Sequence, residues 1–196
     1  MMLHSLYRTL PRASLPLLSK LDMSFSKVGG SYRCVYKEFL ERKLDSTYLA
    51  YIEAVSSAKA RLPLATAILC GAALESAIYM AIQEYRRGVS MLSIKLLGKD
   101  YYNWKNLEQD AETIGILQSG DIGNADYIMD FRDFVHLGEK YSKNRLKTLV
   151  FMQDKETQKI LTITEDLIVN VALNYINAQA EYPGYHLNGK LYHGRK

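Results

Sequence analysis

The chain has 196 residues, a formal net charge of +4 and 48% hydrophobic residues, which suits a single domain with a core of ordinary size. Its two cysteines, Cys34 and Cys70, are too few for a disulfide-stapled scaffold and lack metal-ligand spacing, so we expect reduced thiols in a cytoplasmic protein. Glu75 interrupts the longest apolar stretch, so we predict no membrane-spanning helix.

The chain begins with a basic segment. Residues 1–21 contain three cations and no acid, which resembles a weak targeting peptide, but Pro11 and Pro16 interrupt it. We therefore predict a flexible basic N-terminal extension over residues 1–31 and keep a targeting role as the alternative.

Apolar residues at helical spacing predict a series of helices after this extension. The stretch 64–87 is the longest and most apolar, and its many alanines around Gly71 indicate a central helix that neighbours contact closely. No stretch alternates as a strand would, so we predict an all-α, up-and-down bundle of about five principal helices over residues 32–181. We expect helices near residues 34–43, 46–61, 64–87, 105–118, 122–138 and 157–180.

Glycine and proline mark two further boundaries. Gly120 to Gly123 are expected to form the turn before the helix near 122–138. Pro183 and Gly184 are expected to stop the last helix, leaving a mobile C-terminal tail over residues 182–196.

Arg132 and His136 are the first candidate site residues. They stand four residues apart in a predicted helix and so share a face. An imidazole can move a proton near neutral pH, and a guanidinium can stabilise charge that develops on phosphate oxygens. The pair could therefore support phosphoryl chemistry, although ordinary surface pairs have the same spacing.

Glu75 is the second candidate, because a carboxylate on the apolar face of a central helix is costly unless it is paired. Either Glu75 orients Arg132 or His136, or it reaches the rim of the bundle and is hydrated. Both interpretations remain open from the sequence.

A basic run follows the histidine. These cations could seat RNA phosphates, or they could belong to a solvated loop. Charge is uneven along the whole chain, since residues 45–139 carry 8 Lys and Arg against 13 acids while both ends are basic. The histidines do not cluster as ligands, so we predict no metal and no other cofactor. The candidate RNA-binding residues are Lys140, Lys143, Arg145 and Lys147.

Three segments, in this order, resemble the HEPN-like proteins of prokaryotes. They are AILCGAALE at 67–75, WKNLEQDAETIGI at 104–116 and DFRDFVH at 130–136. In that superfamily an Arg, usually followed by a polar residue, precedes a His on the last-but-one helix of an α bundle. The resemblance covers about residues 46–178.

The resemblance implies a bundle that dimerises so that two Arg/His motifs face one cleft. Active members are metal-independent endoribonucleases of toxin–antitoxin, CRISPR-associated and phage-defence systems. By position, His136 would transfer a proton at the ribose 2′-OH and Arg132 would bind the scissile phosphate. Asp133 would fill the polar position after the arginine, and Glu75 would be the helix carboxylate near the motif.

We therefore expect a homodimer that acts on or binds RNA, together with an antitoxin or defence-complex partner. The alternative is a non-catalytic helical dimerisation or interaction module, in which Arg132 and His136 are structural polar residues. Three residues separate this pair where four or more are usual in the nucleases, and Asp133 stands where Asn is frequent.

Overall fold

The structure is a computed structural model that describes residues 45–88, 103–133, 154–180, 186–187 and 190–191. The described residues form an all-α bundle, as predicted. The elements are α4 (Asp45–Lys59), α5 (Pro63–Gly88), α6 (Trp104–Thr113), α7 (Ser119–Asp133), α9 (Asp154–Ala180) and the short strands β1 (His186–Leu187) and β2 (Lys190–Leu191).

Two predicted features fall on residues that the structure does not describe, and one observed feature was not predicted. The expected helix at 34–43 and the extension over residues 1–31 lie outside the described residues. Within the predicted tail, β1 and β2 pair antiparallel, with His186 opposite Leu191, a pairing that the sequence did not indicate.

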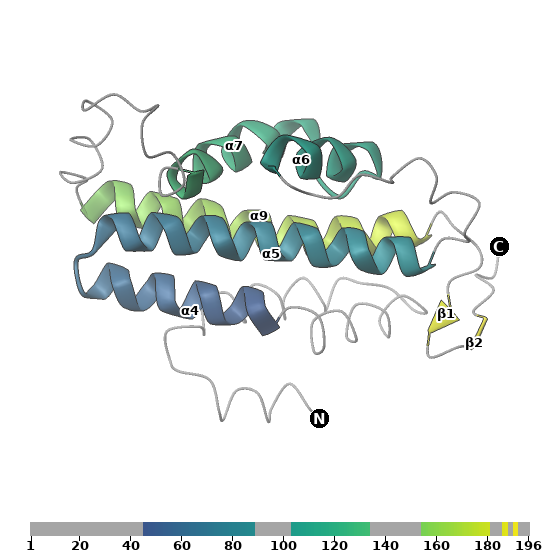
Figure 1. The fold of residues 1–196 in the computed structure, drawn as a ribbon, viewed down its shortest axis with the longest axis horizontal. Helices are drawn as coiled ribbons and strands as arrows, with labels where there is room; N and C mark the ends of the chain where they lie inside the picture. Colours follow the sequence, from purple (N-terminus) through teal and green to yellow (C-terminus); the bar gives the residue numbers. More distant parts are fainter. Residues whose placement is uncertain (1–44, 89–102, 134–153, 181–185, 188–189, 192–196) are drawn as a thin grey trace.

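Helix α5 is the central helix of the bundle. In Figure 1, α4 lies along one side of α5, α6 and α7 lie on the opposite side, and α9 runs beside it. Its fully buried residues include Leu74, Ile78 and Ile82, and its buried alanines let the neighbouring helices approach closely. The close neighbours expected around this helix are therefore present.

The same helix qualifies the sequence argument about membranes. Residues Pro63–Tyr85 have a mean hydropathy of 1.6 and are long and apolar enough to cross a membrane by composition alone. The prediction that Glu75 rules out such a stretch was therefore too strong. Buried core helices meet the same criterion, and 56% of the most apolar part of this stretch is buried inside the bundle.

The boundary between α6 and α7 differs from the prediction. Helix α6 ends at Thr113, because Gly115 has a φ of +76° and closes a Schellman motif. The Gly115 N–H donates to the Glu112 carbonyl (3.0 Å), and the Ile116 N–H donates to the Ala111 carbonyl (2.8 Å). The predicted helix over 105–118 was therefore too long.

The predicted turn at Gly120 to Gly123 was wrong, since both glycines lie inside α7, which begins at Ser119. The turn is instead formed by residues 114–118, and one amide of α9 holds the turn while another holds the start of α7. Asn174 Nδ2 donates to the Ile116 carbonyl (3.0 Å), and Asn170 Nδ2 donates to Asp121 Oδ1 (3.1 Å). An exposed glycine costs a helix only about 1 kcal/mol, so two of them do not end a helix that packs on a core.

Gly115→Ala should destabilise the protein by about 1–2 kcal/mol, because an L side chain is strained at this positive φ. Gly123→Ala is the matched control, since it adds the same methyl group at a helical position where a Cβ meets nothing within 4 Å. That control should stabilise α7 by about 0.5–1 kcal/mol. Denaturant unfolding of the two variants measures both effects, and equal shifts would contradict the assignment of the turn.

Candidate functional site

Arg132 and Glu75 meet where α7 crosses α5. Arg132 Nη1 lies 2.5 Å from Glu75 Oε1, and the two side chains are 18% and 37% exposed. Nη1 itself is shielded from solvent. The carboxylate on the apolar helix is therefore paired with the motif arginine and also reaches the edge of the bundle, so the two interpretations of Glu75 each hold in part.

Gly71 brings the two helices together at this point. Gly71 and Glu75 are four residues apart and share a face of α5. A Cβ built on Gly71 would stand 2.5 Å from the Cβ of Arg132. The α7 backbone at Arg132 therefore lies directly against Gly71, and the guanidinium extends along α5 to the carboxylate one turn later.

The other predicted site residues are not placed. Asp133 is the last described residue of α7, and its side chain is outside the description. The segment that would hold the histidine and the basic run is also outside it. The predicted residues in that segment are His136, Lys140, Lys143, Arg145 and Lys147.

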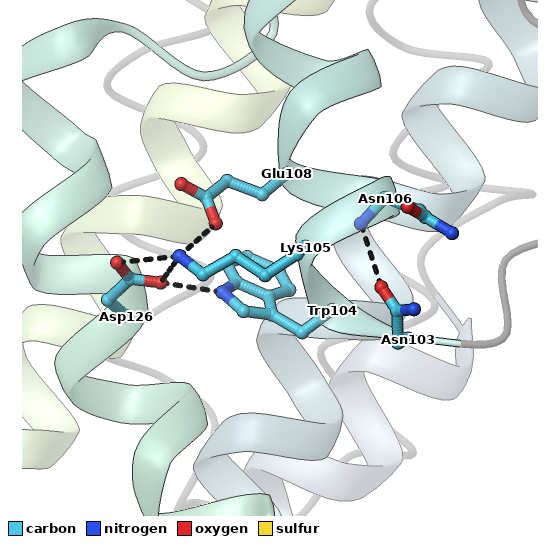
Figure 2. A network of polar contacts seen from close by, with 6 residues as sticks. All are labelled: Asn103, Trp104, Lys105, Asn106, Glu108 and Asp126. Atoms are coloured by element: carbon cyan, nitrogen blue, oxygen red, sulfur yellow. Dashed lines mark hydrogen bonds and ion pairs between the residues drawn. The ribbon is translucent and has the colours of Figure 1, made fainter.

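A second polar network ties α6 to α7 (Figure 2). Lys105 Nζ donates to Glu108 Oε2 (2.7 Å) and to both carboxylate oxygens of Asp126 (2.9 and 3.0 Å). Trp104 Nε1 also donates to Asp126 Oδ1 (2.7 Å). Asn103 caps the helix by accepting from the backbone N–H of Asn106 (3.0 Å).

The charges in this network stabilise one another. Hydrogen bonds to Glu108 and Asp126 raise the pKa of Lys105. Burial alone would raise the pKa of Asp126, but the hydrogen bonds from Trp104 and Lys105 outweigh it and lower that pKa. A cavity of about 370 Å³ adjoins the network and is lined in part by Met129. Sequence reasoning missed this cluster, because only the i, i+3 spacing of Lys105 and Glu108 within it is visible along the chain.

A third polar group is buried between α4, α5 and α9. The Tyr51 hydroxyl donates a short hydrogen bond to Glu165 Oε1, and both residues are buried. Burial, the hydrogen bond to Glu165 and its charge hold the pKa of Tyr51 far above the ordinary value. Cys70 is fully buried beside them, and burial raises its pKa to about 12 although a hydrogen bond with Thr164 opposes the shift.

Helices α6 and α7, the second of which carries Arg132, are strongly acidic. Residues Trp104–Asp133 carry seven carboxylates against two cations, Lys105 and Arg132. Such a surface repels phosphate except at the arginine itself. A polyanion that reaches Arg132 is therefore expected to approach from α5 or α9 rather than over α6.

Two lysines at the start of α9 lie near an aromatic ring of α7. Lys155 and Lys159 line a groove of about 620 Å³ with Ile163. Lys159 Nζ lies 5.3 Å from the centre of the Tyr127 ring, which packs edge-on against Phe131 at 5.2 Å between ring centres. These lysines were not among the predicted RNA contacts, although their i, i+4 spacing places them on one face of α9.

Comparison of the chain with models of protein families, with curated proteins and with solved structures gives no match. The site therefore has to be interpreted from its own chemistry. Among the described residues, no three His, Cys, Asp or Glu side chains are grouped as metal ligands would be.

Proposed function

We propose that the protein is an HEPN-like RNA-binding protein that cleaves single-stranded RNA without a metal. The ion pair between Arg132 and Glu75 is the observation that supports this function most. A carboxylate that already orients the guanidinium, on a side chain that is 18% exposed, removes the cost of orienting it when a phosphate arrives. Arginine also matches the planar geometry of phosphate oxygens better than lysine does.

The proposed reaction is an attack by the ribose 2′-oxygen on the adjacent phosphorus. His136 accepts the proton of the 2′-OH, and Arg132 stabilises the negative charge that grows on the phosphate oxygens. The bond to the 5′-oxygen breaks, and that oxygen takes up a proton. The products are a 2′,3′-cyclic phosphate and a 5′-hydroxyl end.

The distribution of charge on the bundle supports a path for the RNA strand. The acidic surface of α6 and α7 disfavours phosphates, whereas the start of α9 balances Lys155 and Lys159 against Asp154 and Glu156 and so repels them less. A base could stack on the Tyr127 ring in place of Lys159, whose Nζ lies over that ring. We propose that the basic run from Lys140 to Lys147 also binds phosphates of the RNA. A homodimer would bring two such motifs to one RNA.

Arg132→Ala should slow cleavage of labelled single-stranded RNA in EDTA by roughly 10²–10³-fold in single-turnover rate. Arg61→Gly is the control, because it removes a guanidinium away from the ion pair, at an exposed position where glycine suits the φ of 56°. Activity that the chelator removes, or equal activity in Arg132→Ala, would contradict the proposal. Chromatography that resolves cyclic phosphate ends identifies the product.

A second candidate is the non-catalytic interaction module. Two observations favour this alternative: Arg132 is only 18% exposed, and its ion-pair partner, Glu75, belongs to the same chain. Both suit an arginine that joins two helices. In this case the wild-type protein cuts no RNA at any pH. Arg132→Ala then lowers Tm, and neither protein cleaves RNA. An antitoxin or defence-complex partner, a cytoplasmic location and a homodimer remain proposals under either function.

A further inference from the structure

We propose that Gly71 is a positioning residue for Arg132, because the missing Cβ at this point lets α7 come close enough for the guanidinium to meet Glu75. The packing part of this inference stands on geometry alone. Its consequence for catalysis rests on the proposed RNA cleavage.

Gly71 lies in the middle of α5, where glycine is a poor choice for helix stability. Glycine in a helix interior is less favourable than alanine, and α5 has fully buried alanines close by at 67 and 73. A residue with no side chain therefore calls for a local reason.

Arg132 supplies that reason. A Cβ on Gly71 would stand 2.5 Å from Arg132 Cβ, 3.3 Å from its Cγ and 3.6 Å from its Cα. Two carbon atoms approach no closer than about 3.5 Å without repulsion. By contrast, a Cβ on Gly120 or Gly123 of α7 would meet nothing within 4 Å. The close approach is thus specific to the place where the arginine crosses α5.

A methyl group at position 71 would have to move Arg132. The obstructing atom is the Cβ, which is fixed to the α7 backbone and cannot rotate away as the end of a side chain can. On the other side, α5 is held by Cys70 and Ala73, which are fully buried. We therefore infer that Gly71→Ala pushes α7 outward and lengthens the 2.5 Å contact between Arg132 and Glu75.

A double-mutant cycle tests the packing. Gly71→Ala should lower Tm by roughly 2–10 °C. Arg132→Ala keeps the obstructing Cβ, so Gly71→Ala should cost as much in that background. Arg132→Gly removes the Cβ and leaves only the Cα at 3.6 Å, so there the same substitution should cost little or raise Tm. Equal losses in the two backgrounds would overturn the inference, as would a rise in Tm in the wild type like that expected for Gly123→Ala.

A second double-mutant cycle tests whether Gly71 is needed for the ion pair between Arg132 and Glu75. The non-additivity of Glu75→Gln and Arg132→Gln in the wild type should amount to about 1.4- to fivefold in the unfolding equilibrium constant. In the Gly71→Ala background this coupling should disappear. Coupling of the same size in both backgrounds would show that Gly71 has only a packing role and would overturn the positioning role. If Gly71→Ala yields no folded protein, Gly71→Ala/Arg132→Gly must still fold, and failure of both also overturns it.

RNA cleavage provides the functional arm. Gly71→Ala should lower the single-turnover rate at saturating RNA toward that of Arg132→Ala, while Gly123→Ala should retain the wild-type rate. A wild type that cuts no RNA refutes the proposed function and leaves the two stability cycles to decide the role of Gly71. A cleaving wild type with an unchanged Gly71→Ala rate refutes the positioning role alone.

Discussion

Replacing His136 with alanine is expected to slow single-turnover cleavage of single-stranded RNA by roughly 10²–10⁴-fold, because the reaction loses the group that takes the proton from the 2′-OH. The fold should be unaffected, so Tm and RNA affinity should stay close to those of the wild type. A rapid-mixing assay at saturating RNA, with EDTA present, separates the chemical step from binding.

His186→Ala is the matched control for this experiment, since it removes a histidine from β1 instead of the motif. The wild-type rate should also fall toward acidic pH, because a protonated imidazole cannot accept the 2′-OH proton. Loss of this acid limb in His136→Ala would identify the histidine as the base. Equal turnover by the variant, or an unchanged pH profile, would assign the proton transfer to another group.

The positions of the helices could be predicted, because the burial of one face of each helix imposes a helical spacing of apolar residues on the sequence. The central helix was expected at 64–87 and spans Pro63–Gly88, and the last one was expected at 157–180 and spans Asp154–Ala180. The end of α6 could have been found from Gly115, whose position just past the helix is typical of a Schellman cap. The stretch after it was misassigned because two exposed glycines in α7 were given the weight of helix breakers.

The site could be predicted only in part. Glu75 drew attention because a carboxylate on an apolar face needs a partner, and Arg132 was one of two partners considered. The contact with Gly71 and the hydrogen bond between Tyr51 and Glu165 were not predictable, since each depends on how two helices slide along one another. Periodicity fixes which face of a helix is buried, but it leaves that axial offset free.

The buried polar group at Tyr51 and Cys70 gives the second large expected effect. The pKa of Cys70 is raised from 9.0 to about 12 by burial, so the folded protein holds the thiol proton more tightly than the unfolded chain does. The pKa of Tyr51 is raised above its ordinary value of 10.0 by burial and by Glu165. Both groups therefore favour the folded state fully only below their unfolded pKa values.

Stability should consequently fall as the pH rises above about 9, where the thiol of the unfolded chain ionises first. The expected loss is on the order of 1 kcal/mol per pH unit for Cys70 above pH 9, and Tyr51 adds to it above pH 10. Denaturant unfolding from pH 8 to pH 11 measures the slope, and Cys70→Ala should flatten it from pH 9, whereas Tyr51→Phe should flatten it only above pH 10. Tyr79→Phe is the matched control, because it removes the hydroxyl of a tyrosine that is 42% exposed and should leave the slope of the wild type. If Cys70→Ala keeps the wild-type slope between pH 9 and pH 10, the buried thiol does not govern alkaline stability. If Tyr51→Phe and Tyr79→Phe have equal effects, the loss of stability above pH 10 does not come from the buried tyrosine.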